Sequence, residues 1–505
     1  MPWVQAYNPV GNAWLSTLAA ALPTALLLVT LGILRWPAHR AALAGLAAAV
    51  GISVGVFGMP VSAALATTLY GAAYGLFPIG WIVLAAIFLY NLSVRSGTFD
   101  IVKQSVAGLS GDRRVQALLI AFAFGAFIEG CAGFGAPVAI SAALLAGLGF
   151  APRYAASLSL IANTAPVAFG SIGTPIFTLA AVTGLPAASL GAMAGRQLPF
   201  VSVIVPAWLV VTMSGWRGLR GVWPAVLACG GSFALVQFAW SNDVGPELVD
   251  IAGALVSLAA VGLLCLWWRP RDVADVTPAP PAGVRRLRPR EVLRGWTPWI
   301  LLTVFVTLWG MPSVRSALNG RLWTAPQVKV PGLHRLVFRE YPVAASPVDR
   351  SRLDEAAYRE SRAEPAAYTL NWLSATGTSV LFAALATVLV LRMPRREVAE
   401  VARSTWRQMQ VPLATIAMMM ALGFVTRYGG TDATLGLAFT QTGWFYPFFA
   451  AMLGWLGVAL TGSDTSSNAM FGSLQKITAQ QLGLDPVLIT TANSTGGVMG
   501  TMVAA

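Results

Sequence analysis

Charged residues are scarce in this sequence. They make up 10% of its 505 residues, whereas hydrophobic residues make up 56%. A soluble domain carries about 25% charged residues, because its surface has to be solvated. The shortage of charge therefore excludes an ordinary soluble globular protein.

Histidine and cysteine are also rare, and their positions favour neither catalysis nor metal binding. His39 and His334 lie in expected loops, while Cys131, Cys229 and Cys265 stand singly in apolar runs. Cysteines without a CxxC motif or a neighbouring histidine are typical of small buried hydrophobes. The HExxH and GxSxG motifs are missing as well, so we expect no enzyme, no metal site and no cofactor.

Long apolar runs, by contrast, recur along the whole chain. A run of about 20 residues is enough to cross a bilayer as a helix. The pattern predicts an all-α polytopic membrane protein with about 12–13 transmembrane segments, the last of them interrupted by polar residues. The runs are 14–34, 41–58, 77–94, 115–150, 155–183, 198–214, 222–240, 248–268, 296–312, 369–391, 409–426, 444–461 and 464–500.

The net charge of +13 comes mainly from short loops between these runs. Basic loops of this kind stay on the cytoplasmic side, so the charge indicates membrane topology rather than nucleic-acid binding. We expect the uncharged residues 1–13 outside the cell and 269–295 as a cytoplasmic basic loop. Alternation of the spans places 313–368 in an extracytoplasmic loop, which we expect to have little core of its own.

Two distant stretches share one order of features. "GLGFAPRYAASLSLIANTAPVAFG" (147–170) and "QLGLDPVLITTANSTGGVMG" (481–500) both read Leu-Gly-x-x-Pro, an apolar turn or two, then Ala-Asn-Thr/Ser. Before each lies an acid in a break rich in glycine and small residues, "IEGCAGFGAP" and "TGSDTSSNAMFG". This order predicts a duplication into membrane halves 1–268 and 296–505. We expect the two units to be inverted and to bring 124–137 and 461–472 together near the bilayer midplane.

The breaks suggest a binding site, because broken helices are tolerated inside a membrane only where they are buried or line a wet cavity. A half-helix N-terminus there can bind an anion. An acid at such a place is costly, so Glu129 and Asp464 are candidates for proton coupling. Two alternatives remain open: the glycines permit close helix packing, and Asp464 caps a helix. The candidate ligand-binding residues around the breaks are Gly130, Gly133, Gly135, Asn163, Thr164, Ser463, Thr465, Ser466, Ser467, Asn468, Asn493 and Ser494.

These motifs resemble those of the bacterial L-lactate permeases, a family that includes glycolate carriers. The resemblance extends from "AYNPVGNAWLSTL" over nearly the whole chain. It is most specific in "GAFIEGCAGFGAPVAISAALLAGLGF" and "GWLGVALTGSDTSSNAMFG", and is also seen in "LIANTAPVAFGSIGTPI", "GRQLPF", "GWRG", "GGSFA", "NWLSATGT" and "TANSTGGVMG".

The resemblance implies a secondary transporter that takes up small 2-hydroxymonocarboxylates (L-lactate, D-lactate and glycolate) with protons across the bacterial inner membrane. It also implies inverted repeats with re-entrant hairpins. Glu129 would then carry the proton, and Arg196 in "AMAGRQLPF" would hold the substrate carboxylate bidentately. An interfacial, snorkelling role is the alternative for Arg196.

Several alternatives to this function remain open. A sodium-coupled carboxylate carrier is one, since Asn-Thr/Ser turns can expose carbonyls to Na⁺. A channel or a non-transporting sensor is another. The chain ends at "GTMVAA", with Thr501 and Val503 where the family has Lys and Ile, so we also consider a shortened, transport-inactive relative. Substrate preference, stoichiometry and oligomeric state are not determined by the sequence.

Overall fold

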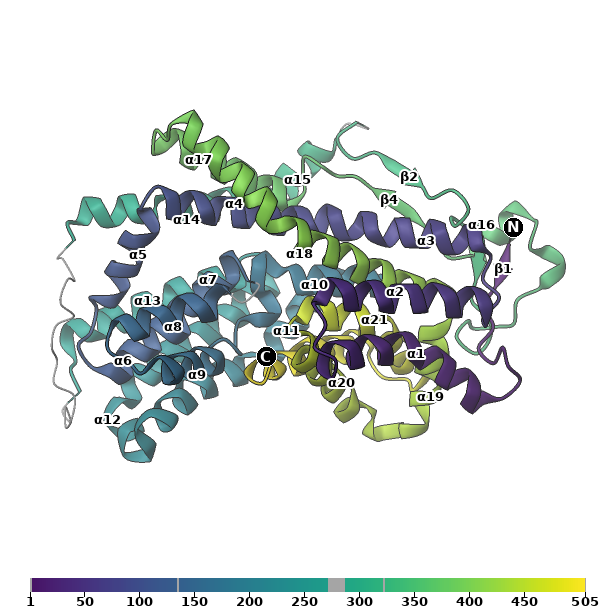
Figure 1. The fold of residues 1–505 in the computed structure, drawn as a ribbon, viewed down its shortest axis with the longest axis horizontal. Helices are drawn as coiled ribbons and strands as arrows, with labels where there is room; N and C mark the ends of the chain where they lie inside the picture. Colours follow the sequence, from purple (N-terminus) through teal and green to yellow (C-terminus); the bar gives the residue numbers. More distant parts are fainter. Residues whose placement is uncertain (1, 134–135, 271–286, 321–322, 505) are drawn as a thin grey trace.

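The computed structural model describes residues 2–133, 136–270, 287–320 and 323–504, and helices dominate it (Figure 1). The chain starts with a short strand, β1 (Trp3–Val4), and continues into long helices joined by tight turns. These are α1 (Ala13–Gly32), α2 (Ala38–Gly55), α3 (Val61–Tyr74), the π-helical turn η1 (Gly75–Gly80), α4 (Trp81–Arg95) and α5 (Thr98–Ala107).

Shorter and broken helices follow, and they include the first glycine-rich break. The π-helical turn η2 (Leu118–Phe124) leads into α7 (Gly125–Cys131), and α8 (Ala136–Gly147) starts after the break. The pair 152–162 and 167–183 bends by 70°. The other elements here are α6 (Arg113–Ala117), α9 (Pro152–Ala162), the 3₁₀ turn η3 (Val167–Phe169), α10 (Gly170–Thr183), α11 (Ala187–Gln197), α12 (Pro199–Asp243) and α13 (Val249–Trp267).

The second half has the same character, with long helices first and a broken region at its end. Its long helices are α14 (Pro289–Gly310), α17 (Thr376–Val390) and α18 (Arg395–Gly429). Between α14 and α17 lie α15 (Pro312–Asn319), β2 (Gln327–Lys329), β3 (Val337–Phe338), η4 (Arg350–Arg352), α16 (Ala356–Arg362) and β4 (Ala367–Thr369). After α18 come α19 (Thr431–Phe439), η5 (Thr440–Phe445), α20 (Tyr446–Thr461), α21 (Asp464–Gln481), α22 (Pro486–Gly497) and η6 (Val498–Met502).

By length and composition, nine helices of the described part can cross a membrane, or ten if the bent pair counts as one span. This number is lower than the predicted 12–13 segments, because several predicted runs share one helix or fall on shorter helices. Helix α12 holds two of them: its backbone leaves helical geometry at Gly215 and Val222. The Ser202 hydroxyl then donates to Gln237 Oε1 at 2.7 Å, so the two parts of α12 lie against each other as a hairpin.

The Leu-Gly-x-x-Pro motif folds in the same way in both predicted units. Gly149 and Gly483 adopt positive φ values of +89° and +68°. This left-handed conformation suits glycine and ends many helices. In each unit the amide of the next residue then bonds to the carbonyl five positions back, Phe150 to Leu145 at 3.1 Å and Leu484 to Ala479 at 2.9 Å.

Left-handed glycines mark two further corresponding positions. Gly97 separates α4 from α5, and Gly430 separates α18 from α19, with φ values of +71° and +86°. Gly133 follows α7 and Gly462 follows α20, with φ values of +56° and +68°. In each half, left-handed glycines thus end helices ahead of the Leu-Gly-x-x-Pro motif.

The segment 313–368 lies against the membrane helices. Strand β3 pairs in parallel with β1, and β2 pairs antiparallel with β4. A small apolar cluster of its own includes Phe338, Val348 and Ala363. The hydroxyls of Tyr70 and Tyr428, on α3 and α18, donate to backbone carbonyls at the end of the segment. The segment thus has little core of its own, as expected, and is docked on α3 and α18.

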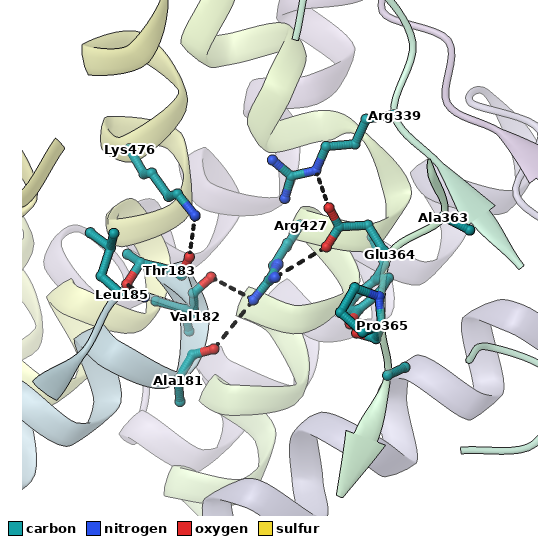
Figure 2. A network of polar contacts seen from close by, with 12 residues as sticks. Ala181, Val182, Thr183, Leu185, Arg339, Ala363, Glu364, Pro365, Arg427 and Lys476 are labelled. Atoms are coloured by element: carbon teal, nitrogen blue, oxygen red, sulfur yellow. Dashed lines mark hydrogen bonds and ion pairs between the residues drawn. The ribbon is translucent and has the colours of Figure 1, made fainter. Parts of the chain in front are cut away.

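A half-buried acid completes this docking (Figure 2). Glu364 accepts from Arg339 Nε at 2.8 Å and from Arg427 Nη2 of α18 at 3.2 Å. Burial acts to raise the pKa of Glu364, but the two guanidinium groups outweigh it and hold that pKa below its usual value. Glu364 is therefore ionised at neutral pH and ties the segment electrostatically to α18.

Candidate functional site: a polar cavity between the two breaks

A cavity of about 290 Å³ lies where the two broken regions meet. This volume is at the lower end of the range of small-molecule sites, about 300–1,000 Å³. Segments on both sides of the predicted duplication line it: as expected, the structure brings Glu129 of the first break together with 462–465 of the second. Its polar side chains are Glu129, Asn163, Ser171, Ser463, Asp464, Thr465 and Thr501.

Glu129 belongs to the last turn of α7, just before the first break, and is 6% exposed. Its carboxylate is enclosed by backbone that lacks side chains. A Cβ on Gly133 would lie 3.3 Å from Glu129 Oε1, and a Cβ on Gly170 would lie 3.1 Å from Glu129 Cδ. Gly170 thus makes room for the acid, and a side chain there would displace it, whereas a side chain on Gly133 would first meet the Ser171 hydroxyl.

A left-handed turn at the start of α10 forms the next wall. Ser171, Ile172 and Gly173 have φ values of +45°, +58° and +76°. Non-glycine residues rarely adopt this conformation, and such strain persists only where the surrounding packing imposes it. Here the Ser171 hydroxyl donates to Ala132 O at 2.9 Å, which ties the turn to the end of α7. The regular part of α10 therefore begins at the cavity, which Pro175 lines.

Asp464 is the first residue of α21 and is 3% exposed. The preceding Ser463 caps the helix, since its side chain accepts from Ser466 N at 3.2 Å. One Asp464 oxygen, Oδ2, accepts from the Ser494 hydroxyl and from Asn468 Nδ2. Its other oxygen, Oδ1, has no hydrogen-bond partner within the described part of the chain. Asp464 thus keeps one buried acceptor atom uncommitted, next to Gly497, where a Cβ would lie 2.6 Å from Oδ1.

A chain of buried amides supports Asp464 from behind. Asn468 Nδ2 donates to Pro175 O at 3.1 Å, and Asn493 Nδ2 donates to Asn468 Oδ1 at 2.9 Å. Gln475 Nε2 in turn donates to Asn493 Oδ1 at 2.7 Å. These bonds join α10, α21 and α22 into one polar unit, so the second break is held in register with the first.

Helices α10 and α21 run in the same direction, and Figure 1 shows them next to each other in the middle of the molecule. Asn468 reaches Pro175 O, and two turns later Lys476 Nζ reaches Thr183 O at 2.7 Å. Their N-terminal ends therefore meet at the cavity. Helix N-termini carry a partial positive charge and free N–H groups, so the pair forms an environment suited to an anion.

The opposite end of α10 is occupied by cations (Figure 2). Arg427 Nη1 donates to Ala181 O and Val182 O, at 3.3 and 3.1 Å, and Lys476 bonds to Thr183 O. Cations at a helix C-terminus are stabilised by the helix dipole. Both side chains are thereby committed far from the cavity, and among the described lining residues there is no Arg, Lys or His.

The remaining candidate residues from the sequence are distributed unevenly. Asn163, Ser463 and Thr465 line the cavity. Gly133 lies beside Glu129, whereas Gly130 packs against α13, where a Cβ would lie 2.9 Å from Asp250 Cβ. Gly135 lies outside the described residues. The other candidates lie behind the lining as buried or half-buried supports: Thr164, Ser466, Ser467, Asn468, Asn493 and Ser494.

Arg196 is not brought to the cavity. It ends α11, its side chain is exposed, and Arg196 Nε donates to Asn242 Oδ1 at 2.9 Å. Its apolar flanks suggested burial, but they belong to a short helix with an accessible end. The sequence reasoning also missed Ser171, Asp250 and Arg427. The signal for Ser171 was the glycine-rich "FGSIGTP", and the signal for Arg427 and Asp250 was a charge inside an otherwise apolar run.

Membrane-length helices packed around a cavity between two broken regions define a multi-pass membrane protein. Comparison with known sequences identifies the group: a family model described as L-lactate permease matches residues 16–505. The chain belongs to the L-lactate permease family.

Three curated relatives are each 44% identical to it. The L-lactate permease of Escherichia coli K12 covers 99% of this chain and is itself covered to 90%. The L-lactate permease of Bacillus subtilis 168 covers 100% of the chain and is covered to 91%. The glycolate permease GlcA of Escherichia coli K12 covers 99% and is covered to 90%. Among solved structures, the YdaH transporter of Alcanivorax borkumensis aligns over 86% of this chain and 77% of its own, with 14% identity and a TM-score of 0.40, too weak a likeness to carry an argument.

Proposed function

We propose that this chain takes up L-lactate and related small 2-hydroxymonocarboxylates, including glycolate, by proton symport. Relatives named L-lactate permease and glycolate permease share 44% identity with it over nearly its full length. The two substrates in those names are hydroxy acids of similar size and equal charge, so one small polar cavity suits both.

The observation that supports proton coupling is the charge of the cavity. Two carboxylates, Glu129 and Asp464, line it, and no cationic side chain does so among the described lining residues. A bound substrate carboxylate would be a third negative group. Two like charges 4 Å apart repel by about 4 kcal/mol at an effective dielectric constant of 20. Protonation of an acid removes this repulsion, so anion binding and proton binding favour each other.

Glu129 is the proton carrier in this proposal, and Asp464 is the second coupling group. Glu129 is enclosed by glycine backbone at the end of α7. Asp464 lies at the N-terminus of α21 and has hydrogen-bond donors of its own. A helix N-terminus stabilises the ionised form of an acid, so Asp464 is the better supported anion of the two.

The substrate carboxylate is bound by dipoles and hydroxyls in this account. The N-termini of α10 and α21 supply N–H groups, and Ser171, Ser463, Thr465 and Asn163 are the polar side chains within reach. Ser466, Ser467, Asn468, Asn493 and Ser494 position them from behind. Entry of the bare anion against an inside-negative potential would cost about 2.3 kcal/mol per 100 mV, and a co-transported proton cancels that cost.

We also propose the orientation, with the N-terminus and 313–368 outside the bacterial inner membrane. The pairing of β1 with β3 supports a common side for these two segments. The basic loops contact one another: Arg95 pairs with Glu397 and Glu400, and Arg114 Nη1 donates to Gly218 O. Figure 1 shows β1 and α16 at one end of the long axis and α5 and α6 at the other. The membrane halves 1–268 and 296–505, the loop 269–295 and the inverted orientation of the repeats belong to the same proposal.

The experiment is uptake of labelled L-lactate and labelled glycolate into proteoliposomes under an imposed pH gradient, an imposed Na⁺ gradient, or neither. We expect saturable uptake that a pH gradient (acidic outside) accelerates and that competing unlabelled substrate abolishes. Stimulation by the Na⁺ gradient alone would show that sodium, and not the proton, is the coupling ion. Flux without saturation or counterflow would indicate a channel.

A further inference from the structure

Asp250 is a second buried acid close to the cavity, and it has no role in the mechanism above. It lies in the first turn of α13 and is 1% exposed. Within the described part of the chain, neither of its carboxylate oxygens has a hydrogen-bond partner. Buried acids are normally paired or hydrogen-bonded, because an uncompensated carboxylate inside a membrane costs several kcal/mol or more. An acid kept in this state needs a functional reason.

The contact between α13 and α7 places Asp250 beside Glu129. Gly130, the residue after Glu129, approaches α13 so closely that a Cβ there would lie 2.9 Å from Asp250 Cβ and 2.9 Å from Ile251 Cγ1. The absence of a side chain at position 130 therefore lets the backbones of α7 and α13 approach closely, with Asp250 on the one helix and Glu129 on the other. This gives Gly130 a physical role different from the ligand contact expected from the sequence.

The surroundings of Asp250 offer no competing charge in the described residues. On α7 it faces Glu129 and Cys131. Helix α10 and the turn η2, which also pack against α13, contain no charged residue. The charged residues of α12 are Arg217, Arg220 and Asp243, all exposed at its bend and its end. Glu129 is therefore the acidic group with which Asp250 can exchange a proton.

A route to Asp250 starts at the link between α12 and α13. This link packs against the left-handed turn of α10, since a Cβ on Gly173 would lie 2.8 Å from Pro246 O. Half-buried Glu247 belongs to the link, three residues before Asp250. Glu247 is thus the acid of this link that lies nearest to Asp250 in the sequence.

We propose that Asp250 is a proton-relay residue that supplies Glu129, so that protons reach the cavity through the contact between α7 and α13. This rests on the proposed proton symport. In the transfer, the O–H bond of the Asp250 carboxyl breaks as its proton passes to a bridging water, and that water gives up a proton as an O–H bond forms on the Glu129 carboxylate. Asp250 then regains a proton from the link side. The step involves no oxidation or reduction. The N-terminus of α13 stabilises the Asp250 carboxylate while it is ionised.

The test compares Asp250→Asn, Asp243→Asn and the unmodified chain in proteoliposomes. Asp243 is the matched control, because it is an exposed acid near the same link. Two rates are measured for each protein: uptake of labelled L-lactate driven by a pH gradient, and exchange of labelled for unlabelled L-lactate at equal pH. We expect Asp250→Asn to reduce the driven uptake at least about tenfold, which is about 1.4 kcal/mol in the barrier, and to keep exchange near normal. Asp243→Asn should change neither rate.

Each other outcome is decisive. Driven uptake that persists in Asp250→Asn overturns the relay. Loss of both rates also overturns it, because Asp250 would then serve folding or binding. Asp250→Glu adds a further readout: it keeps the proton-carrying group, so it should restore driven uptake with a shifted pH profile, which a purely structural acid would not do. If the unmodified chain shows exchange but no proton-driven uptake, the proposed symport itself fails. In that case an infrared difference spectrum between low and high pH still tests whether Asp250 takes up a proton, since its carboxyl band should disappear in Asp250→Asn.

Discussion

The Glu129 carboxylate occupies the space in which a side chain on Gly170 would lie. A Cβ at position 170 would contact Glu129 Oε1 and lie 3.1 Å from Cδ and 3.2 Å from Cγ. Gly170 begins α10 and Glu129 ends α7, so the acid is positioned by the meeting of two broken helices. The position of the acid therefore depends on a residue with no functional group of its own.

Gly170→Ala should impair transport without unfolding the protein. Forcing a methyl group into a packed site costs about 1–3 kcal/mol, so we expect proton-driven uptake to fall by about tenfold or more. Uptake in proteoliposomes measures the effect. Gly51→Ala is the control, because a Cβ there meets nothing within 4 Å. Normal uptake in Gly170→Ala would show that the contact with Glu129 does not matter.

Ser494→Ala should weaken substrate binding through Asp464. The Ser494 hydroxyl donates to Asp464 Oδ2, and a hydrogen bond to a charged group contributes about 1.5–3 kcal/mol. We expect the half-saturating lactate concentration to rise by about tenfold. Ser157→Ala is a matched control, since that hydroxyl is exposed and bonds only to a carbonyl of its own helix, Arg153 O. An unchanged half-saturating concentration in Ser494→Ala would contradict this role.

Arg196→Gln tests whether Arg196 binds the substrate, as the sequence suggested, or is an exposed residue outside the cavity, as in the structure. An arginine that clamps the substrate would be essential, whereas Arg196 is exposed and bonded to Asn242. Surface substitutions usually change stability by less than about 0.5 kcal/mol. We therefore expect lactate uptake to stay within about twofold of normal. A loss of uptake with intact protein would mean that Arg196 reaches the substrate in another conformation of the carrier.

The docking of 313–368 should weaken in acid and after Glu364→Gln. The pKa of Glu364 is held below its usual value of 4.5 by Arg339 and Arg427, although burial acts to raise it. A lowered pKa stabilises the folded state fully above about pH 4.5, and this contribution disappears as the pH falls through the lower folded-state pKa. Breaking a buried ion pair costs about 3–5 kcal/mol. Limited proteolysis of 313–368 in detergent should thus accelerate below pH 4.5, and Glu364→Gln should show the fast rate already at neutral pH.

The control for that experiment is Glu360→Gln. Glu360 pairs with Arg335 in the same segment, but its side chain is 72% exposed, so its loss should have little effect. Equal proteolysis rates for the two variants would contradict the anchoring role of Glu364.

Much of this site could be predicted from particular residues. The glycine-rich breaks and their acids pointed to Glu129 and Asp464, and the Leu-Gly-x-x-Pro motif pointed to two similar units. These signals are local: a left-handed glycine or a helix cap depends on a few neighbouring residues.

The features that the sequence did not reveal depend on contacts between distant segments. Ser171 and Ile172 adopt positive φ only because the end of α7 and the rest of the fold impose it, and propensity argues against it. Asp250 is a single acid in an apolar run, and only the packing of α7 against α13 reveals its contact with Gly130. The role of Arg427 follows only from its contacts with distant segments, a carbonyl at the end of α10 and the loop acid Glu364. Arg196 was wrongly expected near the cavity, because apolar flanks do not show whether a short helix has an accessible end.

The central claim is that Glu129 carries the proton, and Glu129→Gln in proteoliposomes tests it most directly. Gln has the shape of the neutral acid but cannot release a proton. The measurement is the ratio of L-lactate uptake driven by a pH gradient to lactate–lactate exchange at equal pH. The account predicts that exchange continues while the pH gradient no longer accelerates uptake. Uptake that still responds to the pH gradient in Glu129→Gln would contradict this claim. Another acid, first of all Asp464, would then be the candidate proton carrier.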